Sequence, residues 1–150
     1  MLGKLATRLF CLAPAKALPL GTVFAGGLVI ASALSIPRAY APKQDFLGAL
    51  NFVETARQPG DAIATVGLAA FTYNNFYGRG WKEVRTLEDL NSIRTHARHT
   101  WLIYTFPTHV SAVYPEIMTT IQRDFQVAKQ FPGTVGDGTV FVSRSVDRRS

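Results

Sequence analysis

Apolar residues form one long block near the N-terminus of this chain and short, patterned groups after it. The block at 17–36, ALPLGTVFAGGLVIASALSI, contains no charged side chain. A helix rises about 1.5 Å per residue, so twenty residues reach about 30 Å, the thickness of the hydrocarbon core of a bilayer. The pattern therefore predicts a transmembrane helix at 17–36, preceded by a basic leader at 1–16.

A secretory signal peptide is the main alternative for this block. Lys4, Arg8 and Lys16 would form its basic leader, and Ala39-Tyr40-Ala41 is an A-x-A pattern typical of a cleavage site. The apolar run is longer than the usual 7–15 residues of a signal peptide, and Pro42 would directly follow the cut. We therefore expect the block to be retained as an anchor and not cleaved. A buried helix of a soluble domain is also not expected, because such helices carry a polar face that is missing here.

The charge of the chain is concentrated around the apolar block. The net charge is +6, and five of the sixteen basic residues lie in 1–43, which holds no acidic residue. The remainder is nearly balanced, with eleven basic and ten acidic side chains. This distribution argues against a nucleic-acid partner, which requires a basic surface on the domain itself. Three positive charges precede the block and two follow it, which favours a cytoplasmic N-terminus and an external domain.

Beyond residue 42 the periodicity alternates between that of helices and that of strands. Leu47, Leu50 and Val53 recur at helical spacing. The apolar run at 100–106 is the strongest strand in the chain, and Pro107 is expected to end it. The predicted helices cover 46–57, 68–78, 86–97 and 114–123, and the predicted strands cover 62–66, 81–84, 100–106, 125–131 and 139–143.

The order of these segments predicts the fold. Strands alternating with helices, followed by a terminal hairpin, indicate an α/β sandwich with a mostly parallel sheet. Thr86 is expected to cap the helix that follows it, with Asp89 at the capping-box position. The predicted domain covers 42–145 and a polar tail covers 146–150, and we expect the chain to fray after its last strand.

Two candidate binding residues follow predicted strands. Gly67 comes directly after the strand at 62–66, and His109 comes shortly after the strand at 100–106. In open α/β sheets ligands bind beyond the carboxyl ends of the strands, so both residues are expected at the edge that favours a site. The sequence around Gly67 lacks the G-x-G-x-x-G pattern of a nucleotide site, and the glycines at 133–138 are more typical of a hairpin turn.

Two aromatic residues complete the predicted binding set. Tyr73 and Tyr77 flank Asn74 and Asn75 in the helix predicted at 68–78. Aromatic faces stack on sugars and amides form hydrogen bonds, so this group suits a sugar or a lipid headgroup. The ordinary alternative is that these aromatic residues pack the helix on the sheet. The predicted binding residues are thus Gly67, Tyr73, Tyr77 and His109.

No catalytic group or cofactor site is predicted from the residues. His96, His99 and His109 lack the cysteine or H-E-x-x-H partners that a zinc site would need. No serine–histidine–acid order and no paired carboxylates stand out in the sequence. We expect no cofactor and no metal.

Six short segments of the chain resemble segments of one known protein family. They are RxYxPKQDF (Arg38–Phe46), QPGD (Gln58–Asp61), VGLA (Val66–Ala69), WLIYTFPxH (Trp101–His109), RDF (Arg123–Phe125) and FPGTxGxG (Phe131–Gly138). Together with the apolar block they resemble the C-terminal part of bacterial multi-spanning glycosyltransferases. These enzymes are similar to the dolichyl-phosphate-mannose–protein mannosyltransferases and the lipid A aminoarabinose transferases.

This resemblance implies a function and a location. Such enzymes pass a sugar from a polyprenyl-phosphate donor to an acceptor at the periplasmic face, and their acidic catalytic residues lie in an early external loop. No such loop is found in this sequence, so no catalytic residue is carried over. The resemblance implies a single-pass protein of the bacterial inner membrane with its domain in the periplasm. The module would be non-catalytic, a fragment or split partner of a multi-spanning glycosyltransferase core that uses a polyprenyl-phosphate-linked sugar. The alternative is a stand-alone tethered or secreted binding domain.

Overall fold

The computed structural model describes residues 20–40, 43–134 and 136–146, and the side chains of 37–40 are not described. It divides into one compact unit at 1–41 and a second at 42–150. The predicted basic leader at 1–16 lies outside the described residues.

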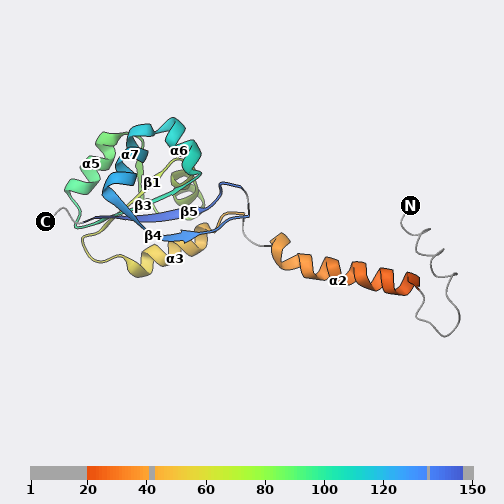
Figure 1. Ribbon diagram of the computed structural model, residues 1–150. Helices are drawn as coiled ribbons and strands as arrows, with labels where there is room; N and C mark the ends of the chain where they lie inside the picture. Colours follow the sequence, from red (N-terminus) through yellow and green to blue (C-terminus); the bar gives the residue numbers. More distant parts are fainter. Residues whose placement is uncertain (1–19, 41–42, 135, 147–150) are drawn as a thin grey trace. The chain divides into compact units, whose positions relative to one another are not determined.

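The first unit contains a single described helix, α2 (Leu20–Tyr40) (Figure 1). No helix in the described ranges is both long enough and apolar enough to cross a membrane. The predicted span at 17–36 begins in residues that the structure does not describe, and the transmembrane helix stays a prediction. The large apolar side chains of α2 that are exposed are Leu20, Val23, Phe24, Leu28, Val29, Ile30, Leu34 and Ile36.

The second unit is an α/β domain built on a five-stranded sheet of order β2-β1-β3-β5-β4. β1 pairs in parallel with β2 and β3, whereas β5 pairs antiparallel with β3 and β4. The predicted α/β class and the terminal hairpin are confirmed. The strands are β1 (Ala62–Val66), β2 (Lys82–Val84), β3 (Thr100–Thr105), β4 (Phe125–Phe131) and β5 (Val140–Ser145).

The expectation of a mostly parallel sheet is wrong, because the sheet is mixed. β4 runs parallel to β3 but is not its neighbour. The crossover from β3 to β4 leaves a gap one strand wide, and β5 turns back into this gap, as a hairpin requires. Two of the four strand pairings are therefore antiparallel.

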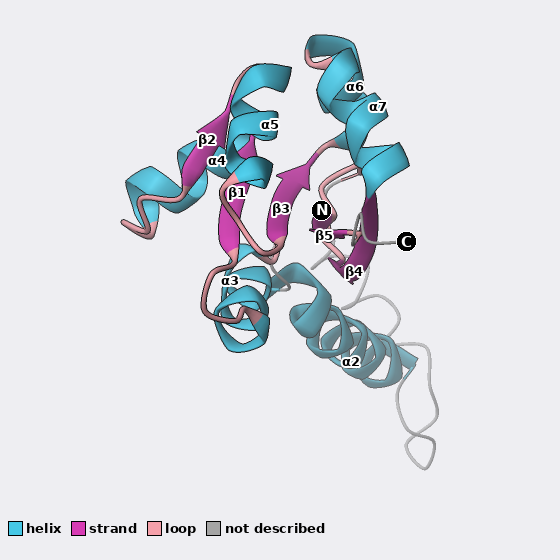
Figure 2. Ribbon diagram, turned by 90° about the vertical axis from the view of Figure 1, so that its left-hand side faces the viewer, coloured by secondary structure: helices cyan, strands magenta, loops and turns pink. Residues whose placement is uncertain are grey.

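Helices cover both faces of this sheet, as Figures 1 and 2 show. Successive side chains of a strand point to opposite faces. Trp101 and Ile103 of β3 accordingly face one core, and Leu102 and Tyr104 face the other. The first face carries α3 (Phe46–Ala56), α4 (Leu68–Phe71) and the π-helix η1 (Thr72–Phe76), and the second carries α5 (Leu87–Thr95), α6 (Pro107–Val113) and α7 (Pro115–Asp124).

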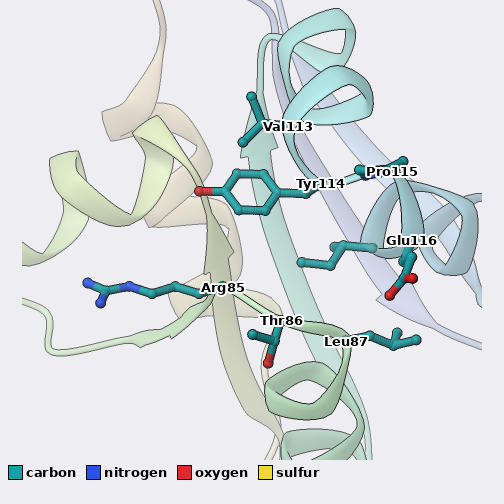
Figure 3. A pocket seen from close by; sticks show the side chains of 8 residues that line it. Arg85, Thr86, Leu87, Val113, Tyr114, Pro115 and Glu116 are labelled. Atoms are coloured by element: carbon teal, nitrogen blue, oxygen red, sulfur yellow. The ribbon is translucent and has the colours of Figure 1, made fainter.

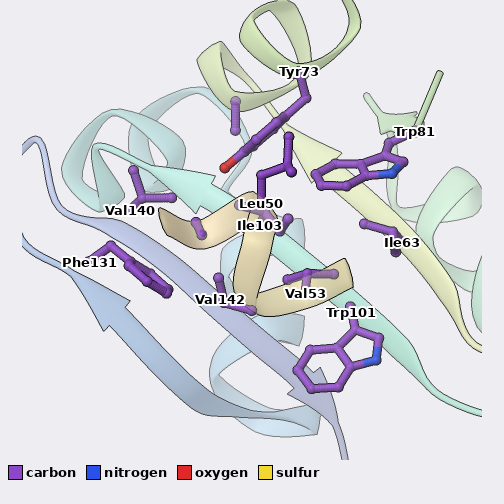
Figure 4. Close-up of a cluster of buried hydrophobic side chains, with 12 residues drawn as sticks. Leu50, Val53, Ile63, Tyr73, Trp81, Trp101, Ile103, Phe131, Val140 and Val142 are labelled. Atoms are coloured by element: carbon purple, nitrogen blue, oxygen red, sulfur yellow. The ribbon is translucent and has the colours of Figure 1, made fainter. Parts of the chain in front are cut away.

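The core under α3 is rich in aromatic side chains (Figure 4). The ring of Tyr73 is fully buried and lies 4.6 Å from the ring of Trp81, centre to centre. Its hydroxyl donates a hydrogen bond to the carbonyl of Phe46 at 2.9 Å. Because Phe46 opens α3 and Tyr73 lies in η1, this contact fixes the start of the domain against η1.

Local chemistry explains where α3 begins and which residues it buries. The side chain of Asp45 caps the helix by accepting a hydrogen bond from the Gly48 N–H at 2.8 Å. Leu50 and Val53 are buried as their spacing predicts, whereas Leu47 is exposed. The helix therefore presents a narrower apolar face to the sheet than the sequence indicates.

Helix α6 is the one described helix that the sequence pattern does not predict. Pro107 ends β3 as expected, but it also occupies the first turn of α6, where proline costs little because its missing N–H needs no partner. Phe106 makes the turn between the two elements with a positive φ of 53°. The segment 107–113 carries little apolar periodicity, which is why its pattern indicates no helix.

Two other predicted elements differ in detail. The helix predicted at 68–78 is divided into α4 and η1, whose wider hydrogen-bond spacing leaves no mark on apolar periodicity. The last strand continues to Ser145 instead of ending at 143, because Arg144 pairs with Trp101 of β3 and Ser145 pairs with Phe125 of β4.

Candidate functional site

The candidate site lies at the edge of the sheet formed by the carboxyl ends of β1, β2 and β3. The parallel strands bring Gly67, Arg85 and Phe106 to this edge, because each follows directly after one of them. Gly67 turns the chain into α4 with a φ of 60° and a ψ of −130°, a conformation that only glycine adopts readily. A side chain at this position would also approach the ring of Tyr114.

An open pocket of about 290 Å³ lies at this edge (Figure 3). It is formed between the segment that follows β2 and the junction of α6 with α7. Tyr114 is half-buried, and Arg85 and Glu116 are exposed, so the pocket combines a phenol, a guanidinium and a carboxylate. Its lining residues are Arg85, Thr86, Leu87, Val113, Tyr114, Pro115, Glu116 and Ile117.

The charges at the pocket are already partly compensated. The Arg85 guanidinium lies 2.8 Å from the carboxylate of Glu83, and 73% of the Arg85 side chain is exposed. The hydrogen bond and charge of Glu83 raise the pKa of Arg85. An exposed pair of this kind contributes little to stability, so Arg85 can exchange Glu83 for another anionic group at small cost.

The N-terminus of α5 beside the pocket carries a capping box. Asp89 accepts hydrogen bonds from the backbone N–H groups of Arg85 and Thr86, at 3.0 and 2.9 Å. The Thr86 hydroxyl accepts one from the Asp89 N–H at 3.1 Å. The predicted capping box is thus confirmed. These hydrogen bonds lower the pKa of Asp89, and the carboxylates of Glu88 and Asp89 in the first turn disfavour a phosphate at this helix end.

Three segments that are distant in sequence meet at the same edge beside β3. The Gln44 amide donates to the Thr105 hydroxyl at 2.9 Å. The Thr108 N–H donates to Asp137 at 3.1 Å. Gly133 packs so closely on the carbonyl of Lys43 that any side chain there would collide with it. The segment leading into α3, the start of α6 and the loop between β4 and β5 therefore form one continuous surface.

The four predicted binding residues are not all at this edge or at the surface. Gly67 and His109, which is exposed on α6, both belong to the carboxyl edge. Tyr77 is 37% exposed at the end of η1, and its ring lies 5.8 Å from that of Tyr73. Tyr73 itself is fully buried with its hydroxyl bonded to the backbone. The ordinary alternative, core packing, therefore describes Tyr73.

The residues that form the pocket were missed by sequence reasoning. Arg85 follows a three-residue strand, and Tyr114 lies between two short helices, so neither belongs to a motif. The position of Arg85 directly after a strand was the one available signal, since polar residues at strand ends are candidates for binding. The position of Tyr114 depends on α6, which the pattern does not predict.

A second groove, of about 520 Å³, lies at the opposite edge, between the start of β3 and the strands of the hairpin. The Trp101 indole N–H donates to Asp61 at 2.9 Å. Burial acts to raise the pKa of Asp61, but the hydrogen bonds from Trp101 and Gln58 and the charges of His99 and Arg144 lower it overall. The groove is lined by His99, Trp101, Gln126, Val127, Ala128, Arg144, Ser145 and Val146.

The described residues contain no group of three or more His, Cys, Asp or Glu side chains placed to hold a metal ion. Comparison of the chain with protein-family models, with curated proteins and with solved structures found no match. The carboxyl edge provides a surface and an open pocket whose lining combines apolar and polar side chains.

Proposed function

We propose that this chain is a membrane-tethered, extracytoplasmic module that acts with a multi-spanning glycosyltransferase using a polyprenyl-phosphate-linked sugar. The module has no transferase activity of its own and resides in a bacterial inner membrane. The apolar block at 17–36 supplies the tether, and the domain at 42–145 supplies the surface for the partner. The proposed contact surface is the carboxyl edge of the sheet.

One observation carries this proposal. Three of the segments on which the family resemblance depends, at 38–46, 101–109 and 131–138, contact each other at that edge. They are separated by up to about ninety positions in sequence, so nothing in the chain order requires them to meet. The first of them directly follows the apolar block, so the shared surface is also the part of the domain closest to the tether along the chain.

The experiment is purification of the tagged full chain from detergent-solubilised membranes, followed by identification of co-purifying proteins. His109 is exposed at the carboxyl edge. His96 is exposed at the C-terminal end of α5, which leads into the start of β3 and so lies at the opposite edge. We expect a multi-spanning protein with the parent chain and with His96→Glu, and its loss with His109→Glu. If no multi-spanning protein accompanies any of the three, the proposal fails and the stand-alone binding module is favoured.

A further inference from the structure

The outer surface of α4 and η1 exposes a group of large apolar side chains, which we call the aromatic patch. Phe71 is 56% exposed and Phe76 is 75% exposed, and their rings meet edge to face at 5.8 Å. Leu68 and Tyr77 extend the patch, at 43% and 37% exposed. α4 lies on the side of the sheet that ends in β2 (Figure 2). Apolar side chains clustered in this way on a surface indicate an interaction site.

The backbone beneath the aromatic patch is well anchored. The Asn74 amide donates to the carbonyl of Trp81 at 3.1 Å, and the Asn75 amide donates to the carbonyl of Phe71 at 2.9 Å. Tyr73, which lies between Phe71 and Phe76 in the sequence, is fully buried. The patch is therefore presented to solvent by an ordered helix and does not arise from a frayed end.

One uncompensated cation lies beside the aromatic patch. The Arg79 N–H donates to the carbonyl of Tyr73 at 3.1 Å, and the Arg79 side chain is exposed and forms no ion pair within the described residues. Lys82 belongs to the other face of β2, which it shares with Val84 of the core under α5, whereas Trp81 packs on Tyr73. Exposed aromatic rings beside an uncompensated cation match the interface of a bilayer that contains anionic lipids.

We propose that the aromatic patch, with Arg79, docks the domain on the anionic headgroup region of the membrane. Phe71, Phe76 and Tyr77 enter the interface, and Arg79 faces lipid phosphates. Each contribution is weak by itself, and stable membrane binding takes two signals together. The tether of the proposed function supplies the second signal, and the inference rests on that part of it.

The length of the connection between the tether and the domain favours the membrane surface over a soluble protein as the partner of the aromatic patch. Nine residues, 37–45, separate the tether from the start of α3. The first four continue α2 and add about 6 Å, and the other five, fully extended, span about 17 Å. The Tyr73 hydroxyl, at the base of the aromatic patch, is bonded to the carbonyl of Phe46, the first residue of α3. A membrane tether at 17–36 thus keeps the base of the patch within reach of the bilayer surface.

The experiment compares two labelled positions on the full chain. Cys11, the single cysteine, is replaced by serine, and an environment-sensitive dye is attached to Phe76→Cys or, as the matched control, to Val127→Cys. Val127 is also an exposed apolar residue, at 43%, but lies on β4 at the other end of the sheet. Each protein is reconstituted in phosphatidylcholine vesicles, with and without phosphatidylglycerol, that carry a headgroup-depth nitroxide quencher.

We expect the dye at position 76, but not at 127, to be quenched, and more strongly in the vesicles with phosphatidylglycerol. Arg79→Gln should weaken the docking by about fivefold, whereas Lys82→Gln, on the other face of β2, should leave it unchanged. Membrane association is measured separately by flotation of the vesicles in a density gradient. Equal quenching at both positions in protein that floats with the vesicles would contradict the docking surface but not the tether. Protein that does not float with the vesicles would overturn both. Quenching at 76 that is indifferent to phosphatidylglycerol would overturn the anionic-lipid assignment.

Discussion

Replacing Tyr73 with alanine should destabilise the domain strongly, because the structure makes this residue part of the core. The side chain is fully buried, with its ring 4.6 Å from the ring of Trp81 and 5.6 Å from that of Phe46. Removing a buried aromatic ring costs about 3–5 kcal/mol, including the cavity it leaves. For a domain of this size such a loss lowers the melting temperature by roughly 15–30 °C.

Two matched variants separate the contributions in this prediction. Tyr73→Phe removes only the hydrogen bond to the Phe46 carbonyl and should cost about 1–2 kcal/mol. Tyr77→Ala removes a neighbouring ring that is 37% exposed and should cost less than Tyr73→Ala by a clear margin. Thermal unfolding is followed by tryptophan fluorescence, for which Trp81 is a local reporter. Equal melting of Tyr73→Ala and Tyr77→Ala would refute the core assignment.

The titration of Tyr73 provides an independent check. Burial raises its pKa above the usual value of about 10, and the charges of Tyr77 and Asp45 raise it further. The unfolded chain therefore loses the proton at lower pH than the folded one, and the stability from this group is fully present below about pH 10 and declines above it. The alkaline loss of stability should be smaller in Tyr73→Phe than in the parent.

Three further variants test other parts of the fold by the same unfolding assay. Ile103→Asp should unfold the domain, because a buried, unpaired carboxylate on the central strand costs several kcal/mol; melting like the parent would refute the central placement. Asp124→Asn should cost about 3 kcal/mol, because it breaks a largely buried pair with Arg94 at 2.8 Å. Hydrogen bonds from Arg123 and Arg94 lower the pKa of Asp124, so the stability from this pair should be present above about pH 4 and be lost in acid. The Asp124→Asn variant should lack that acid dependence. Thr86→Ala should cost about 1 kcal/mol by removing the cap that pairs with Asp89, and an unchanged stability would contradict the capping box.

The elements with strong periodicity or end signals could be predicted from the sequence. β1 and β3 are runs of apolar residues bounded by turn residues, and α5 begins at a capping box that the residue types specify. The parallel pairing of these strands also follows from the helices between them, which is why the edge that carries Gly67 and His109 could be located in advance.

The remaining features depend on contacts that local patterns do not encode. More than one sheet order is compatible with a hairpin of β4 and β5, and local patterns do not indicate that β5 lies between β3 and β4. Burial separates Tyr73 from Tyr77, although both are aromatic and four residues apart, because Tyr73 lies within η1 against the core whereas Tyr77 follows the last residue of η1. The pocket at Arg85 and Tyr114 arises only once α6 carries the chain from the end of β3 to Tyr114.

A reporter fusion measures both the membrane tether and the side of the membrane on which the domain lies. A reporter that is active only outside the cytoplasm is fused after Ser150, and its activity is measured in membranes after a carbonate wash. We expect an active reporter that remains in the washed membranes on the full-length chain. An active reporter released in soluble form, on a shortened chain beginning near Pro42, would contradict the tether and favour a cleaved signal peptide. An inactive reporter would contradict the external location of the domain.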